Sequence, residues 1–335
     1  MMNTLRNQYN FQPGEVITGK WYGNKYKIIR ELGCGANGIV YLAEYRGAPV
    51  ALKLSQNGMS IISEMNVLKS FNKVQGSALG PYLIEADDYI QNGRKHSFYA
   101  MEYIRGDGFL HFVAKNGHEW IGVLLLQLLK SLSSLHKKGW VFGDLKPENL
   151  IVTTPSYIIR CVDVGGTTVI GRSIKEFTEF FDRGYWGLGT RKAEPSYDLF
   201  AVAMIIINTA YPARFSRKGQ GYSQLRQQIQ AKKELWRYKN LLENALSGKY
   251  MNAEAMRNDL MIILQRDSKT QVSSAGLNQQ KHNRHQNNKA AGNTRAVRHV
   301  HKKNPGKIHG RLLETLVLVT LVSVLYILYL YSRLV

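Results

Sequence analysis

The chain has 335 residues, with 45 Lys and Arg against 24 Asp and Glu, which gives a formal charge of +21 at pH 7. An apolar share of 44% excludes a wholly disordered chain, and only two cysteines exclude a disulfide scaffold and fit a reducing compartment. The excess positive charge points to a polyanionic partner: nucleic acid, an anionic membrane surface or phosphate.

A glycine-rich turn follows the N-terminal extension 1–25 and a predicted strand, Tyr26–Leu32. Glycines let backbone N–H groups approach phosphate oxygens without a Cβ in the way. Gly-x-Gly-x-x-Gly also occurs in dinucleotide sites, but those need a helix after the glycines, and here a second strand, Ile39–Tyr45, follows. Strand–turn–strand predicts a flap over nucleotide phosphates. The turn residues are Gly33, Cys34, Gly35, Ala36, Asn37, Gly38, Ile39 and Val40.

A lysine, Lys53, lies inside the apolar strand predicted for Val50–Leu54. A buried ammonium is costly unless it is paired. The next predicted helix, Ser60–Phe71, offers Glu64 as a carboxylate partner, and nucleotide phosphates offer a second one. The alternative, for the motif taken alone, is a lysine on an edge strand.

A polar segment follows the leucine-rich helix predicted for Trp120–His136. Within it, Asp144 can accept a hydroxyl proton, Lys146 can neutralise a moving phosphoryl group, and Asn149 can hold a metal ion. The alternative is an ordinary turn.

A carboxylate, Asp163, ends the strand predicted for Ile158–Val162 and precedes Val164-Gly165. A carboxylate at a strand end can chelate Mg²⁺ that bridges phosphates. Taken alone, Asp163 fits a hairpin turn better, and the other motifs favour the metal site.

Strands dominate the first part of the chain, and helices dominate the part from Asp198 onward. This order predicts an α+β fold with a β-rich N-lobe at about 26–104 and an α-helical C-lobe at about 105–266. The strand expected at Phe98–Ile104 joins the two lobes and is, at the least, a core strand.

The C-terminal part of the chain differs in composition from the rest. Residues 267–311 are basic and poor in large apolar residues, which predicts a disordered linker. Residues 312–331 are almost wholly apolar and long enough for one transmembrane helix, rather than a buried core helix. Only 332–335 follow, so we expect a tail anchor in the plasma membrane, and the basic flank predicts a cytoplasmic N-terminal part.

Residues from about Tyr26 to Arg266 resemble the eukaryotic-type (Hanks-type) bacterial serine/threonine protein kinases. The resemblance implies a bilobal protein-kinase-like fold, ATP and Mg²⁺ as cofactors, and transfer of the γ-phosphoryl group to Ser or Thr of cytosolic proteins. With the membrane tail, the chain is similar to tail-anchored kinases associated with sporulation in endospore formers.

The family's roles carry over by position. Leu32–Val40 match the nucleotide-covering loop, Lys53 the phosphate anchor, and Glu64 its ion-pair partner. Met101, Glu102 and Tyr103 match the hinge that binds adenine through its backbone. The resemblance further implies that Asp144, Lys146 and Asn149 are catalytic and that Asn149 and Asp163 bind the metal. Asp198 matches the aspartate that begins the central helix of the C-lobe, and Thr178 the threonine that contacts the catalytic residues.

Three departures from the family pattern bear on regulation and docking. Phe142-Gly143 replaces His-Arg before Asp144, so the usual receptor of an activation-segment phosphate is missing, and we predict activity that does not require that switch. Val164 replaces the usual Phe. No clean Ala-Pro-Glu motif lies between Gly165 and Asp198. The segment Thr178–Trp186 lies instead at about the distance from Asp198 at which the family has that motif.

Two other functions fit parts of the pattern: a small-molecule phosphotransferase of the same fold, which often has Gly before the catalytic Asp, and a non-catalytic scaffold that binds nucleotide, DNA or membrane. The basic linker fits a tether attracted to anionic lipid, or non-specific DNA binding that activates the kinase by bringing copies together. Self-association would allow trans-autophosphorylation at a hydroxyl of the activation segment. The candidates for DNA contact in the C-lobe are Arg214, Arg217, Lys218, Lys232, Lys233, Arg237 and Lys239.

Overall fold

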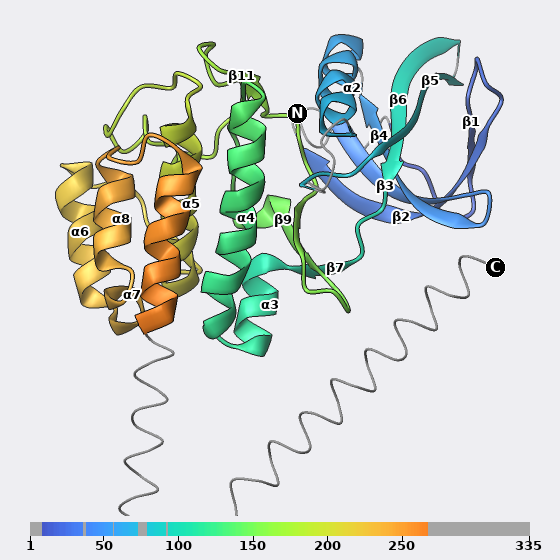
Figure 1. The fold of residues 1–335 in the computed structure, drawn as a ribbon. Coiled ribbons are helices and arrows are strands. Elements are labelled where there is room, and N and C mark those ends of the chain that lie inside the picture. The colour runs from blue at the N-terminus through green and yellow to red at the C-terminus, as the bar shows by residue number, and fades with distance from the viewer. Residues whose placement is uncertain (1–8, 36–37, 56, 73–78, 92, 267–335) are drawn as a thin grey trace, which may run out of the picture. The chain divides into compact units, whose positions relative to one another are not determined.

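The computed structural model describes residues 9–35, 38–55, 57–72, 79–91 and 93–266 (Figure 1). These residues belong to one unit of the chain, Met1–Ser273. The predicted linker 267–311, the span 312–331 and the tail 332–335 lie outside them. None of the helices in the described ranges is both long enough and apolar enough to cross a membrane.

An antiparallel six-stranded sheet forms the N-lobe, in the order β1-β2-β3-β4-β6-β5. The helix α2 (Gly58–Asn72) packs against β4, β5 and β6 (Figure 1). The register pairs Lys53 of β4 with Val40 of β3 on one side and with Tyr99 of β6 on the other. The strands are β1 (Val16–Thr18), β2 (Lys25–Gly35), β3 (Gly38–Tyr45), β4 (Ala48–Ser55), β5 (Leu83–Gln91) and β6 (Arg94–Glu102).

The sheet departs from the sequence prediction at three places. β1 lies entirely before Tyr26 and pairs with β2, so part of the predicted N-terminal extension 1–25 belongs to the sheet. β5 was not expected, because Glu85, Asp87 and Asp88 disfavour a strand by propensity. β6 ends at Glu102 rather than Ile104, because the chain there leaves the sheet to enter the C-lobe.

Helices form most of the C-lobe, as predicted (Figure 1). Short strands and turns between α4 and α5 hold the polar segments identified in the sequence. The helices are α3 (Phe109–Asn116), α4 (Glu119–Lys137), α5 (Pro195–Ala210), α6 (Gly221–Ala231), α7 (Lys233–Trp236), α8 (Lys239–Leu246) and residues 253–266. The short elements are β7 (Gly106–Gly108), β8 (Trp140–Val141), η1 (Pro147–Asn149), β9 (Leu150–Thr153), β10 (Ile159–Cys161), β11 (Thr168–Val169) and η2 (Glu179–Phe181).

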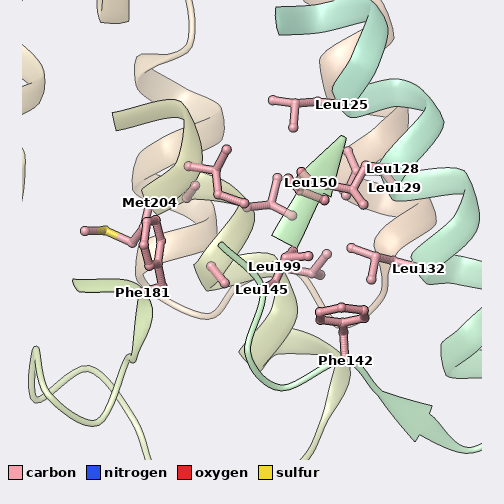
Figure 2. Close-up of a cluster of buried hydrophobic side chains, with 14 of the residues drawn as sticks. Leu125, Leu128, Leu129, Leu132, Phe142, Leu145, Leu150, Phe181, Leu199 and Met204 are labelled. Atoms are coloured by element: carbon pink, nitrogen blue, oxygen red, sulfur yellow. The ribbon is translucent and has the colours of Figure 1, made fainter. Parts of the chain in front are cut away.

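The C-lobe core anchors the segment that carries Asp144 (Figure 2). Phe142, Leu145 and Leu150 are buried against leucines of α4 and against α5. α5 is buried on nearly all sides, as an apolar helix without a polar face must be. Buried apolar side chains therefore alternate with polar residues along this segment, and their packing fixes its backbone against the C-lobe core.

Candidate active site

Two adjoining cavities, of about 420 and 830 Å³, share Gly33, Val40, Lys53, Glu148 and Asp163 in their walls. The smaller one is lined on one side by the β6 end and the segment after it, including Met101, Glu102, Tyr103 and Ile104. The larger one brings together all four residues on which the predicted phosphate chemistry depends. These are Lys53, Asp144, Asn149 and Asp163.

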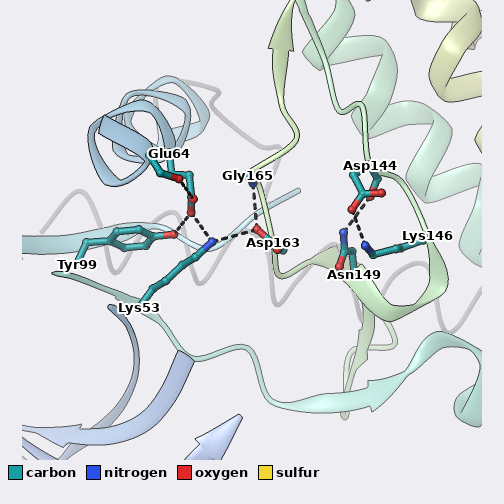
Figure 3. Close-up of polar contacts among 9 residues, drawn as sticks. Lys53, Glu64, Tyr99, Asp144, Lys146, Asn149, Asp163 and Gly165 are labelled. Atoms are coloured by element: carbon teal, nitrogen blue, oxygen red, sulfur yellow. Dashed lines mark hydrogen bonds and ion pairs between the residues drawn. The ribbon is translucent and has the colours of Figure 1, made fainter. Parts of the chain in front are cut away.

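The Lys53 ammonium lies between two carboxylates (Figure 3). Its Nζ is 2.6 Å from Glu64 Oε2 and 3.5 Å from Asp163 Oδ1. Ser60 Oγ donates to the other Glu64 oxygen at 3.1 Å, and Tyr99 OH donates to Oε2 at 2.6 Å. α2 thus supplies the expected ion-pair partner, and Tyr99 supports it. The sequence did not indicate Tyr99, because its link to Glu64 runs between β6 and α2.

The charges in this cluster stabilise one another. Burial opposes the Lys53 ammonium, but the carboxylates of Asp163 and Glu64 outweigh it and raise the pKa of Lys53. The same ammonium, with the Gly165 N–H that donates to Asp163 at 3.0 Å, lowers the pKa of Asp163 against the effect of burial. Asp163 therefore stays ionised and able to attract a cation at neutral pH.

A second polar cluster lies across the larger cavity (Figure 3). Lys146 Nζ donates to Asp144 Oδ2 at 2.5 Å and to Thr178 Oγ1 at 3.1 Å, and Thr178 Oγ1 donates to Asp144 Oδ1 at 3.0 Å. Asn149 Nδ2 donates to the Asp144 carbonyl at 2.9 Å. The contact predicted for Thr178 with Asp144 and Lys146 is present.

Asp198 supports this cluster from α5. Its carboxylate accepts hydrogen bonds from the backbone N–H groups of Phe142 and Gly143, at 2.8 and 2.9 Å. His136 Nε2, on α4, lies 2.8 Å from the same carboxylate. The sequence predicted that Asp198 begins the central C-lobe helix, but it did not predict the contact with His136. The two residues are far apart in the chain, and no local pattern indicates that they meet.

The glycine turn lies over the larger cavity, whose walls include Gly33, Cys34, Gly35 and Gly38. Gly38 has φ +149°, and a Cβ there would be 2.3 Å from the Leu54 carbonyl oxygen, so only glycine fits. Leu32 lines the smaller cavity. Ala36 and Asn37 lie outside the described residues.

Ile39 is fully buried in the N-lobe core and lines neither cavity. Alternation along β3 explains this, because Val40 points to the cavity and its neighbour must point away. The expectation that Ile39 contacts nucleotide therefore does not agree with its position.

The segment Met101–Tyr103 lines the smaller cavity as expected, and a residue missed in the sequence holds it. Arg160 of β10 forms a two-pronged ion pair with Glu102, at 2.5 and 2.8 Å, and donates to the Gly80 carbonyl at 2.6 Å. This pair joins the end of the N-lobe sheet to a C-lobe strand.

The donors present fit a divalent cation held jointly with phosphate. Asp163 offers a carboxylate, and Asn149 keeps its amide oxygen available because its Nδ2 is bonded to Asp144. Among the described residues no group of three or more His, Cys, Asp or Glu side chains could hold a metal by itself.

A two-lobed fold with a glycine flap, a paired lysine and an Asp/Lys/Asn cluster around one cavity defines a protein kinase. A family model described as "Protein kinase domain" matches residues 26–291, and the chain belongs to this family. It is a bacterial Hanks-type serine/threonine kinase, and so an enzyme whose family uses ATP and a divalent metal to act on proteins.

Two curated relatives and one solved structure illustrate the similarity. The chain is 50% identical over 322 residues to the serine/threonine-protein kinase YabT of Bacillus subtilis (strain 168), covering 96% of this chain and 95% of the relative. It is 24% identical to the serine/threonine-protein kinase ArnS of Sulfolobus acidocaldarius over 59% of this chain and 38% of the relative. The structure of vaccinia related kinase 3 is similar with a TM-score of 0.58 at 16% identity, covering 79% and 94% of the two chains. That structural likeness bears on the fold alone.

Proposed function

We propose that this kinase transfers the γ-phosphoryl group of Mg²⁺-bound ATP to Ser or Thr of cytosolic proteins, with the residues named above in their predicted roles. The observation that carries the proposal is the shared cavity lined by Lys53, Asp144, Asn149 and Asp163. Asp144 accepts the proton of the acceptor hydroxyl, and Lys146 neutralises charge on the moving phosphoryl group. Adenine binds through the backbone of Met101–Tyr103, in the smaller cavity.

Lys53 and the glycine turn orient the phosphates, and Glu64 holds Lys53 in place. Asn149 and Asp163 would hold Mg²⁺, which supplies charge neutralisation for the phosphate oxygens. Thr178, bonded to both Asp144 and Lys146, keeps these two side chains in one orientation towards the acceptor.

A phosphotransfer assay tests the proposal. Full-length protein in detergent, with labelled ATP and Mg²⁺, should label Ser or Thr of a protein substrate, and Asp144→Asn should abolish the label. Label only on a small alcohol would indicate a small-molecule phosphotransferase, and no label would indicate a non-catalytic scaffold. Label that survives Asp144→Asn would contradict the assignment of this residue.

We also propose that residues 312–331 anchor the chain in the plasma membrane, with 26–266 on the cytoplasmic side and 267–311 as a basic tether. The support is the length and apolar character of 312–331 and the basic residues before it. Membrane fractionation of the chain with and without 312–331 tests the anchor. Protease accessibility of 26–266 in intact and opened cells tests the orientation.

DNA is the proposed activator. The support is the positive charge of the linker and of exposed C-lobe residues such as Lys218, Lys233 and Arg237. Arg214 is less suited to this role, because its guanidinium is paired with Glu148 and packs on Phe181. Duplex DNA should stimulate phosphotransfer, and the stimulation should fall steeply with salt. Phosphotransfer that is stimulated by anionic vesicles but not by DNA would indicate instead that the linker is a tether attracted to anionic lipid.

A further inference from the structure

The turn between β1 and β2, residues 19–24, presents two adjacent aromatic side chains to solvent. Trp21 and Tyr22 are 65% and 68% exposed. Single exposed apolar residues are ordinary on a protein surface, whereas large ones that lie together mark a contact surface. Neither side chain lines one of the two cavities of the active site, so the catalytic chemistry gives no reason for their exposure.

The 19–24 turn is fixed to β5 by a buried carboxylate. Asp87 accepts hydrogen bonds from the backbone N–H groups of Trp21 and Tyr22, each at 3.0 Å. A Cβ at Gly19 would lie 2.2 Å from Asp87 Oδ2, so the close approach depends on the absence of a side chain at this position. β1 and β5 are the two edge strands of the sheet, and the turn joins them. The aromatic pair is therefore held on a fixed backbone, which lowers the entropy cost of a contact made through it.

Every backbone N–H group from residue 19 to residue 23 is bonded within the protein. The donors other than Trp21 and Tyr22 reach carbonyl oxygens: Gly19 that of Asn24 at 2.9 Å, Lys20 that of Asp88 at 2.7 Å and Gly23 that of Gly19 at 3.1 Å. The indole N–H of Trp21 donates to Asp88 Oδ2 at 2.8 Å. An exposed turn can leave such donors to water. This turn can instead lose its water without leaving a backbone or indole donor unpaired.

Exposed charge around the aromatic pair is positive. Lys20 Nζ lies 4.5 Å from the centre of the Trp21 ring, and Arg46 donates to the side chain of Asn24 at 3.4 Å. The carboxylates near the turn are buried or half-buried and accept hydrogen bonds from the protein; they are Glu85, Asp87 and Asp88. The exposed cations are Lys20, Lys25, Arg46 and Lys95. The surface therefore combines apolar rings with outward positive charge.

We propose that the 19–24 turn binds an anionic phospholipid surface, with Trp21 and Tyr22 at the boundary between headgroups and acyl chains and the cations on lipid phosphates. Trp and Tyr are the residues enriched at that depth. The indole loses no hydrogen bond on leaving water, because Asp88 already accepts from it. Duplex DNA would match the cations but offers no apolar layer for the rings. This contact is distinct from the linker and from 312–331, and it is independent of phosphotransfer.

Quenching of tryptophan fluorescence by lipids brominated on their acyl chains tests the contact. Full-length protein in vesicles of phosphatidylcholine and phosphatidylserine should be quenched, and Trp21→Phe should remove most of that quenching. Trp236→Phe is the matched control and should leave it in place. Trp236 is 55% exposed on α7, its indole donates to the Gln230 carbonyl at 2.9 Å, and Lys233 and Arg237 are its basic neighbours.

The role of charge is tested on the same protein without any variant. Vesicles of phosphatidylcholine alone should quench Trp21 much less than anionic vesicles, and added salt should reduce quenching in the anionic ones. Replacing Lys20 and Lys25 by glutamine should lower the ratio of bound to free turn by about fivefold for each charge removed. Equal quenching in neutral and anionic vesicles would overturn the role of these cations.

Sedimentation of the same vesicles separates this contact from the proposed anchor. Protein that sediments with vesicles while Trp21 stays unquenched would overturn the contact and leave the anchor standing. Quenching that depends on Trp236 instead would overturn it as well, because the C-lobe would then face the lipid. A change in Trp21 emission with duplex DNA but not with vesicles would assign the turn to nucleic acid. Protein that sediments with no vesicle would overturn both the anchor and the contact.

Discussion

The hydroxyl of Tyr99 donates a 2.6 Å hydrogen bond to Glu64 Oε2, the same oxygen that accepts from Lys53. Tyr99 lies directly across from Lys53 in the sheet and is fully buried. Burial and the neighbouring Glu64 carboxylate raise the pKa of Tyr99 well above its ordinary value, so the phenol remains a donor. α2 is thus held with Glu64 facing Lys53 by contacts that involve no phosphate.

Tyr99→Phe should weaken this arrangement without changing the packing of the ring. A hydrogen bond to a charged group contributes about 1.5–3 kcal/mol, so we expect kcat to fall by roughly tenfold or more. Steady-state kinetics of the variant, compared with Tyr89→Phe on β5 as control, measure this. In a Glu64→Gln background the effect should shrink, since the acceptor has changed. Equal kcat for Tyr99→Phe and wild type would contradict the role.

Gly143→Ala should destabilise the protein, and Gly143→Arg, which carries the same Cβ, should do so as well instead of restoring a phosphate receptor. Gly143 has φ +84°, and a Cβ there would be 2.5 Å from the Gly166 carbonyl oxygen. The left-handed conformation alone costs a non-glycine residue about 1–2 kcal/mol, and the close contact adds to it. Gly171→Ala is the control, because it shares a positive φ of +90° but has nothing within 4 Å. Chemical denaturation should show a much larger loss for Gly143→Ala than for Gly171→Ala, and equal losses would refute the steric argument.

Arg160→Met should raise the KM for ATP by several-fold and change kcat less. The variant removes the ion pair that fixes Glu102, whose segment lines the smaller cavity, but it leaves Lys53 and Asp144 untouched. ATP titrations in the phosphotransfer assay measure both constants, with the exposed Arg172→Met as control. A fall in kcat at constant KM would show that Arg160 does not act by positioning the ATP-binding segment at Glu102.

Glu176→Gln should stabilise the nucleotide-free protein at pH 7. Burial, and then the nearby Asp163 carboxylate, raise the pKa of Glu176 above 4.5. An acid with a raised pKa in the folded state loses stability as the pH rises through that pKa, so its ionised form is unfavourable at pH 7. Urea denaturation should show the gain at pH 7 and its disappearance below pH 4.5, where both states bind the proton. A gain that is independent of pH would rule out this electrostatic cause.

Local spacing was sufficient to predict the four residues of the larger cavity on which the phosphate chemistry depends. Lys53 in an apolar strand, the Asp144–Lys146–Asn149 segment and Asp163 at a strand end each follow a short pattern, and the structure brings them together. Tyr99, Arg160 and His136 could not be found in this way, because each acts through a partner far along the chain and no local pattern records the pairing.

Segments without a clear apolar pattern were the hardest part of the fold to predict. β5 carries three acidic residues and was missed, whereas the apolar α4 was placed within about one residue at each end. The predicted linker and membrane span lie outside the described residues and stay predictions.

The backbone at Gly143 limits how this enzyme could evolve. A single codon change that introduced arginine there would also need the Gly166 carbonyl to move, so one substitution at this position is not enough to install a phosphate receptor.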